Sequence, residues 1–251
     1  MADSGPIVLV GLVVRADVFA FRLAGTEHVD RLQPALKKTT GARIYTALRR
    51  EIITAQHRPA DRLAVDRLAE RFGTSVSPVR DALTKLGQEG LVTIKPRSGY
   101  FVTRMTFKEL QDLLDLREVL ETAALERAVK VISADKLHHL ETLHGRYTGD
   151  DPESYDRYTQ ENRRFHVSLA EASGNLELAR QVGHLLDRLA RFMVMTRTGK
   201  VMPDSHAQII SALRKGSAVA ARRALVNELR TAAKKILAHV LAEESGRWGL
   251  N

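Results

Sequence analysis

Residues 61–91 read DRLAVDRLAERFGTSVSPVRDALTKLGQEGL, and this stretch decides the fold of the N-terminal part of the chain. Apolar side chains recur every three or four residues from Asp61 to Phe72, which predicts a helix. Gly73 follows, where a helix end favours a residue that tolerates positive φ. Ser75 is placed to cap a further helix, with Pro78 in its first turn. Two short helices joined by a glycine turn indicate a helix-turn-helix unit.

The flanking residues extend this unit on both sides. A helical pattern covers Gly41–Gln56 and ends before Pro59. After the unit, Leu91–Ile94 is typical of a strand, residues 95–99 of a basic turn, and Tyr100–Thr103 of a returning strand. The sequence therefore predicts a winged helix-turn-helix.

From residue 106 onwards the pattern is one of long amphipathic helices without a credible strand. Ser133, Asp151, Asn175, Asp204 and Ser217 stand where N-caps are expected. An all-helical bundle of about six helices follows from this pattern. The predicted helices are Phe107–Val131, Ala134–Tyr147, Glu153–Ser173, Leu176–Thr196, Ser205–Lys215 and Ala218–Glu243.

The fold class is thus mainly α, with four segments along the chain. We expect a weakly ordered extension at 1–35, the winged helix-turn-helix at 36–105, a helical effector-binding and dimerisation domain at 106–245, and a tail at 246–251. Leucine stripes within the bundle predict core, so the periodicity does not identify a dimer interface.

The positive charge is concentrated in one small module. The chain of 251 residues has 39 Lys and Arg against 30 Asp and Glu, and residues 34–105 hold 14 of the former and six of the latter. Such a concentrated field favours a polyanion such as double-stranded DNA, although a basic surface without a partner is the alternative. The absence of cysteine excludes disulfides, zinc-thiolate sites and cysteine nucleophiles.

No apolar run approaches the ~20 residues that a membrane helix needs, since the longest run, Ile7–Val14, has eight. No basic residue precedes it, so it is also a poor signal peptide. We therefore expect a cytoplasmic protein that does not bind membranes.

Four motifs of the N-terminal part and four of the bundle resemble known families. The first set resembles the DNA-binding domain of GntR-family bacterial transcriptional regulators, and the second resembles the FCD ligand-binding domain of their FadR-like subfamily. The resemblance runs from about Ala42 to His239. The motifs are residues 68–75 (LAERFGTS), 77–83 (SPVRDAL), 89–92 (EGLV) and 96–102 (PRSGYFV), then 117–121 (REVLE), 165–166 (FH), 171–175 (EASGN) and 206–210 (HAQII).

The resemblance implies a homodimer that binds a palindromic operator, with the third helix in the major groove and the wing tip near the minor groove. Arg80, one turn into that helix, can present a bidentate fork to guanine, a contact that contributes about 1–3 kcal/mol of discrimination. The helix N-terminus attracts phosphate as well. The candidate DNA-binding residues are Ser75, Ser77, Arg80, Lys95, Arg97, Ser98 and Gly99.

Two positions depart from the family pattern. Many relatives carry arginine where this chain has Val76 and Asp66. Val76 can still contact a thymine methyl group, whereas Asp66 repels phosphate unless Arg62 or Arg67 pairs with it. An operator sequence cannot therefore be borrowed from relatives.

In the resembled bundle, a divalent metal is held by an Asp and a His four residues apart and by two later histidines. These positions fall on Asn162, His166, His206 and Glu228, so two of the four keep the family's residue. Two imidazoles, a carboxylate and an amide oxygen can hold zinc, nickel or manganese. A metal-free hydrogen-bonded cluster is the alternative.

Arg117 is the candidate effector anchor. The family pattern places an arginine facing the pocket here, where it suits an anionic small molecule such as a carboxylate. The alternative is an exposed salt bridge with Glu121, four residues on along the helix.

Three functions are compatible with these observations. The leading interpretation is a transcriptional repressor whose operator affinity is controlled by an effector in the bundle, and not an enzyme. An effector-independent architectural DNA binder is the first alternative. A metal-dependent hydrolase is the second, and no partnered general base or nucleophile motif supports it.

Overall fold

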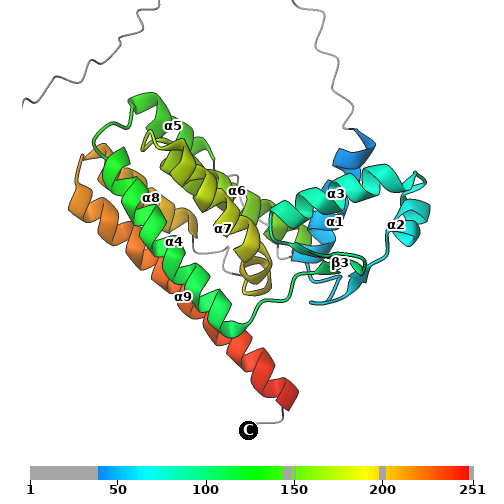
Figure 1. Cartoon of the computed structure of the whole chain (residues 1–251). Helices are drawn as coiled ribbons and strands as arrows, with labels where there is room; N and C mark the ends of the chain where they lie inside the picture. Colours follow the sequence, from blue (N-terminus) through cyan, green and yellow to red (C-terminus); the bar gives the residue numbers. More distant parts are fainter. Residues whose placement is uncertain (1–38, 144–148, 150, 198–201, 249–251) are drawn as a thin grey trace, which may run out of the picture. The chain divides into compact units, whose positions relative to one another are not determined.

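A computed structural model of the chain describes residues 39–143, 149, 151–197 and 202–248. The predicted extension at 1–35 and the end of the predicted helix Ala134–Tyr147 lie outside the described residues. The described part is mainly helical, as predicted (Figure 1). The N-terminal half, which is the expected DNA-binding module, contains α1 (Thr40–Ile53), β1 (Arg62–Leu63), α2 (Val65–Phe72), α3 (Val76–Gln88), β2 (Val92–Lys95) and β3 (Gly99–Val102).

The winged helix-turn-helix forms because three amphipathic helices and a small sheet share one apolar core. Leu48 of α1, Leu68 of α2, Leu83 of α3 and Val102 of β3 all belong to this core. Gly73 ends α2 with a φ of 61°, a left-handed conformation that glycine adopts without a steric penalty. The sheet is antiparallel with strand order β1-β3-β2, so the wing hairpin lies beside β1.

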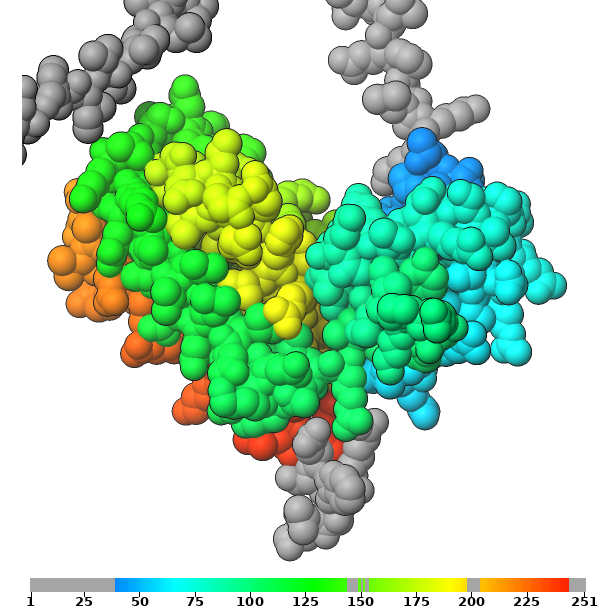
Figure 2. Space-filling model, viewed as in Figure 1, coloured from blue at the N-terminus to red at the C-terminus, as the bar shows by residue number. Residues whose placement is uncertain are grey.

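The second half is a bundle of six helices in the described part of the chain. They are α4 (Phe107–Ala128), α5 (Ala134–Thr142), α6 (Pro152–Glu171), α7 (Leu176–Met195), α8 (Met202–Arg214) and α9 (Ala218–Trp248). Helix α4 packs against α6, α7 and α9, and α8 packs against α9 (Figure 1). The side chains of α4 (green) and α7 (yellow) meet in the space-filling view (Figure 2).

Local sequence signals start and stop these helices. Thr106 and Glu109 form a reciprocal capping box at the start of α4. Ser133 and Asn175 cap α5 and α7 through side-chain oxygens, as predicted. Gly174 has a φ of 75° between α6 and α7, so it permits the tight reversal there.

Several predicted boundaries are wrong. Residues 61–64 are not helical, because Arg62 and Leu63 pair with the wing strand as β1 and α2 begins only at Val65. Ser75 precedes α3 but its side chain makes no capping hydrogen bond. Asp204 lies inside the first turn of α8 rather than before it. Helix α9 continues to Trp248, beyond its predicted end at Glu243 and into the predicted tail.

None of the described helices combines the length and the apolar character that a membrane span requires.

Candidate functional site

Helix α3 presents a polar face because its apolar face is used by the core. Val79, Leu83 and Leu86 are fully buried, whereas Ser77 and Arg80 are exposed on the other side. Arg80 is therefore free of packing constraints and available to a large ligand. Ser75, just before the helix, is also exposed.

The wing and α3 form one basic groove of about 500 Å³. It brings Arg80 together with Lys95, Arg97, Ser98 and Gly99, which are five of the seven predicted DNA-binding residues. Ser75 and Ser77 are not among its lining residues. The groove also contains Arg62, which the sequence indicated only as a partner for Asp66. Because β1 places Arg62 opposite Phe101 of the wing, the strand pairing adds a fourth cation to this surface.

The tip of the wing is a tight turn with Arg97 in a left-handed conformation. The Ser98 amide donates to the Lys95 carbonyl over 3.0 Å, and Arg97 has a φ of 62°. A non-glycine residue in this region costs on the order of 1 kcal/mol. An exposed arginine is thus held in a conformation that sterically favours glycine. This fits a side chain whose role is to contact a binding partner rather than to stabilise the fold.

The two departures from the family pattern lie on the same surface. Asp66 lines the basic groove, and within the described residues it makes no ion pair with Arg62 or Arg67. Its carboxylate therefore reduces the positive field of the groove. Val76 is half-buried and packs against the core of the helix-turn-helix.

A second constellation lies in the interior of the bundle. Helix α4 supplies Arg117 and Glu121, α6 supplies Asn162 and His166, α8 supplies His206, and α9 supplies Glu228. All six side chains are buried, with 4% or less of their surface exposed. The predicted metal residues and the predicted effector anchor are thus brought together from four helices.

Two histidines share one carboxylate oxygen in this cluster. Nε2 of His166 and Nε2 of His206 each lie 3.1 Å from Oε1 of Glu228. On its other side, His166 Nδ1 lies 2.6 Å from Oε2 of Glu121. The ring of His206 stacks on Phe165 with centroids 3.8 Å apart, which fixes its plane.

Arg117 pairs with Glu121 but is not exposed. Its Nε donates to Oε1 of Glu121 over 2.6 Å, and the side chain is 2% exposed. The predicted alternative of an exposed salt bridge was therefore right about the partner and wrong about the environment. The sequence indicated Glu121 only as a partner of Arg117, because its contact to His166 comes from another helix and leaves no signal in the spacing along α4.

The charges in the cluster balance when His166 is protonated. Burial opposes the charged imidazolium, but the carboxylates of Glu121 and Glu228 outweigh burial and raise the pKa of His166 to about 9. Burial would raise the pKa of Glu228, yet His166 and His206 hold it far below its usual range. Burial lowers the pKa of His206, so this ring is neutral. Two cations, Arg117 and His166, then face two carboxylates.

When His166 is protonated, one of its close contacts cannot be a hydrogen bond. Its Nε2–H points to Glu228, so the Nη2 of Arg117, 3.1 Å from the same nitrogen, faces a donor. If the Nε2 proton is absent, Nε2 accepts from Arg117 but meets the Glu228 oxygen as a second acceptor. Either state of this nitrogen leaves one neighbour poorly matched. A cation between Nε2 and Glu228 would take the place of the proton there, but it would leave Arg117 without an acceptor on this ring.

Further polar atoms in the cluster lack partners. Both side-chain polar atoms of Asn162 and Oε2 of Glu228 are buried without a hydrogen bond. A buried polar group without a partner costs about 1–3 kcal/mol. Such groups next to converging imidazoles are the feature of the cluster that its own hydrogen bonds do not account for.

Helix α6 connects this cluster to the N-terminal half. Arg163, next to Asn162 in sequence, donates two hydrogen bonds of 2.8 Å to the carboxylate of Asp187 on α7. Asp187 also accepts a hydrogen bond of 3.3 Å from Nη2 of Arg49 on α1. Asp187 is 4% exposed whereas the side chain of Arg163 is 35% exposed, so these ionic contacts are partly buried.

The comparisons with known proteins agree with this geometry. Residues 40–102 match the family described as bacterial regulatory proteins, gntR family, and residues 112–231 match the FCD domain. The chain belongs to the GntR family. This GntR-family chain has an FCD domain, so it is a transcriptional regulator rather than an enzyme, and the predicted family, fold class and absence of enzyme activity are confirmed.

Similar proteins support the same assignment. The regulator is 25% identical over 211 residues to the HTH-type transcriptional repressor RspR of Escherichia coli K12, covering 82% of this chain and 91% of that one. It is 29% identical over 174 residues to the repressor GlaR of the same strain, covering 65% and 79%. The structure of E. coli McbR/YncC has the same fold, with a TM-score of 0.62 at 18% identity over 80% of this chain and 99% of that one.

Proposed function

We propose that this regulator is a repressor whose operator affinity is set by a small-molecule effector in the FCD bundle, with help from a divalent metal. The observation that carries the proposal is the buried cluster of Arg117, Glu121, His166, His206 and Glu228, which combines charged groups and unpartnered polar atoms in the interior of the bundle. A cluster needed only for stability would satisfy its own polar atoms.

The donor set fits a divalent cation. Ligand atoms of His166, His206 and Glu228 all lie within 4.8 Å of one another, and the two imidazole nitrogens are each 3.1 Å from the carboxylate oxygen. Tetrahedral zinc with ligand bonds of about 2.0–2.1 Å requires donor separations of roughly 3.3 Å. The two nitrogen–oxygen distances are therefore close to those of a site for zinc, nickel or manganese.

Asn162 and Arg117 would complete this site. The unpartnered amide oxygen of Asn162 is available as a neutral fourth ligand. A bound metal would supply a positive centre with open positions for a carboxylate, and Arg117 next to it would bind the same anion. The effector class that suits this arrangement is a small carboxylate.

The link through α6 supports a path for regulation. A ligand that shifts Asn162 and His166 acts on the helix that also carries Arg163, and Arg163 shares Asp187 with Arg49 of α1. An effector changes operator affinity only through its differential affinity for two arrangements of the protein. Ionic contacts that break or form between those arrangements provide that difference.

DNA binding would use the basic groove, and the protein would act as a homodimer on a palindromic operator. Leu116 and Val119, three residues apart on one face of α4, are 45% and 63% exposed, and this pair would suit a surface buried between two copies. Because operator DNA lies in the bacterial cytoplasm, the proposed function places the protein there.

The decisive test combines metal analysis with DNA binding. Purified protein is analysed for metals by mass spectrometry before and after chelator dialysis, and its affinity for DNA selected from a random pool is measured with and without a panel of carboxylates. We expect near-stoichiometric metal that Glu228→Gln abolishes, with an effector response that disappears in the same variant. DNA binding that no carboxylate alters, with or without metal, would refute effector control.

A further inference from the structure

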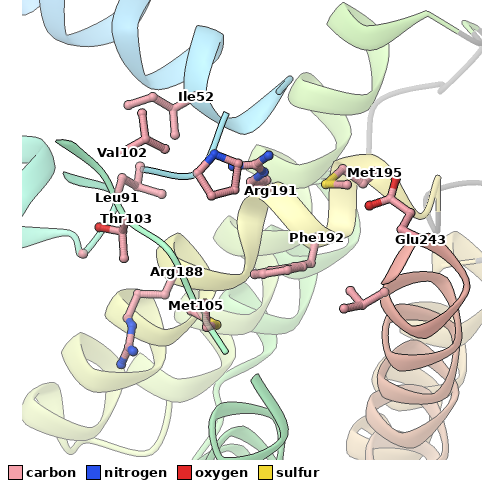
Figure 3. Close-up of a pocket in the computed structure, with 13 residues that line it drawn as sticks. Ile52, Leu91, Val102, Thr103, Met105, Arg188, Arg191, Phe192, Met195 and Glu243 are labelled. Atoms are coloured by element: carbon pink, nitrogen blue, oxygen red, sulfur yellow. The ribbon is translucent and has the colours of Figure 1, made fainter. Parts of the chain in front are cut away.

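A second cavity lies apart from the buried cluster. It has a volume of about 130 Å³ and is lined both by the DNA-binding half and by helices α7 and α9 of the bundle. Figure 3 shows Ile52, Leu91 and Val102 on one side and Phe192 and Met195 on the other, with Arg191 between them. The walls are thus mainly apolar, and they come from segments far apart in sequence.

The polar lining of this cavity is unbalanced towards positive charge. Arg188 and Arg191 contribute two guanidinium groups against one carboxylate, that of Glu243. Glu243 already lies 3.4 Å from the Nε2 of His239, one turn earlier on α9. The cavity therefore has a net positive lining.

Arg191 is the key side chain. It is half-buried, and within the described residues it makes no hydrogen bond or ion pair. Burial lowers the pKa of its guanidinium, although the carboxylates of Glu243 and Asp61 act in the opposite direction from a distance, so the charge is partly desolvated without a hydrogen-bonded anion. A desolvated guanidinium binds a carboxylate with two parallel hydrogen bonds, more strongly than one in water does.

The size of the cavity limits what it can hold. An engineered apolar cavity of about 150 Å³ in another protein binds benzene, so the volume here suits one six-membered ring or a short branched chain. Apolar walls beside an unpaired guanidinium suit a ligand that has one apolar group and one anionic group. We propose that this cavity is a second ligand site, which binds a small hydrophobic monocarboxylate with its apolar group between Leu91 and Phe192 and its carboxylate on Arg191.

Such a ligand would act on regulation independently of the metal cluster. Ile52 and Val102 belong to the DNA-binding half, whereas Phe192 and Met195 belong to the bundle. Occupancy of the site therefore stabilises the arrangement in which both halves line it. By linkage, the ligand changes the affinity for the operator by the same factor by which its own affinity differs between the DNA-bound and the DNA-free protein.

Benzoate is the probe that tests this site, with neutral benzamide as its matched control. Binding to the full-length, chelator-treated protein is measured by isothermal titration calorimetry at millimolar ligand. We expect saturable binding of benzoate that is at least about tenfold tighter than that of benzamide, because hydrogen bonds to a charged group add at least that much affinity. Equal affinities or no saturable benzoate binding would overturn the proposal.

Variants locate the binding. Arg191→Gln should lower the affinity for benzoate about tenfold or more. Arg180 is an exposed arginine on the same helix, and Arg180→Gln should bind benzoate like the wild type. Val240→Trp fills the cavity and should remove the binding of both ligands. Thermal melts check that each variant is folded, and wild-type affinity in folded Arg191→Gln or Val240→Trp would overturn the assignment.

One more variant separates this site from the proposed metal site. His206→Ala should keep the wild-type affinity for benzoate, because His206 does not line the cavity. Loss of benzoate binding in folded His206→Ala would mean that the probe occupies the buried cluster, and the second site would be refuted while effector control through the cluster would stand.

Discussion

The stability of the metal-free regulator should fall as the pH rises from about 6.5 to 9, because of His166. The ordinary pKa of histidine is 6.5, which applies to the unfolded chain, and Glu121 and Glu228 raise it to about 9 in the folded protein despite burial. A group with a raised pKa stabilises the fold fully below its unfolded pKa and loses that contribution as the pH passes the folded value. A shift of this size corresponds to about 3 kcal/mol of unfolding free energy.

The assay is urea unfolding in the presence of a chelator, at closely spaced pH values between 6 and 9.5. Wild type is compared with His166→Gln, whose side chain has a single NH₂ group and no charge. The difference in unfolding free energy should be largest near pH 6 and should shrink by about 3 kcal/mol by pH 9. His184→Gln, an exposed histidine on α7, is the matched control and should follow the wild-type profile.

A constant difference between wild type and His166→Gln across this range would refute the reasoning. It would mean that His166 is neutral in the folded protein, with Nε2 accepting from Arg117 and the Glu228 carboxylate left without a charged partner. The charge balance of the cluster, and the competition between a proton and a metal at Nε2, would then be wrong.

Four other variants test the basic groove, the buried cluster and the ionic contacts of Asp187. Arg80→Ala should weaken binding to the selected DNA by about 1–3 kcal/mol in a gel-shift titration while melting like the wild type, and unchanged affinity would remove α3 from the groove. Arg97→Gly should raise stability by up to about 1 kcal/mol, because it relieves the left-handed conformation, yet reduce the salt dependence of DNA binding by about one unit. Glu228→Gln should abolish metal uptake in elemental analysis without changing DNA affinity. Asp187→Ala should destabilise the protein in urea by about 3 kcal/mol, at the low end for a buried ion pair because the side chain of Arg163 is 35% exposed, and an effect below 1 kcal/mol would show that its partners are satisfied by water.

Local signals in the sequence were sufficient for the architecture. These signals are the helical spacing, the glycines Gly73 and Gly174, and the caps at Ser133 and Asn175. Each depends only on residues nearby in the sequence, so the winged helix-turn-helix and the six bundle helices were predictable. The identity of His166 and His206 as buried polar residues followed from the resemblance. Boundaries failed where a contact from elsewhere decided them, as at Arg62, which pairs with the wing strand instead of starting α2.

The sequence by itself determined the elements, the basic module and the pair of histidines. Only the tertiary structure decided which charged groups lie together: Arg62 and Asp66 on the basic groove, Glu121 between Arg117 and His166, and Arg191 beside a mainly apolar cavity. The physical reason is that burial and pKa depend on partners from other helices, and the spacing along one helix does not encode which face of another helix it will contact.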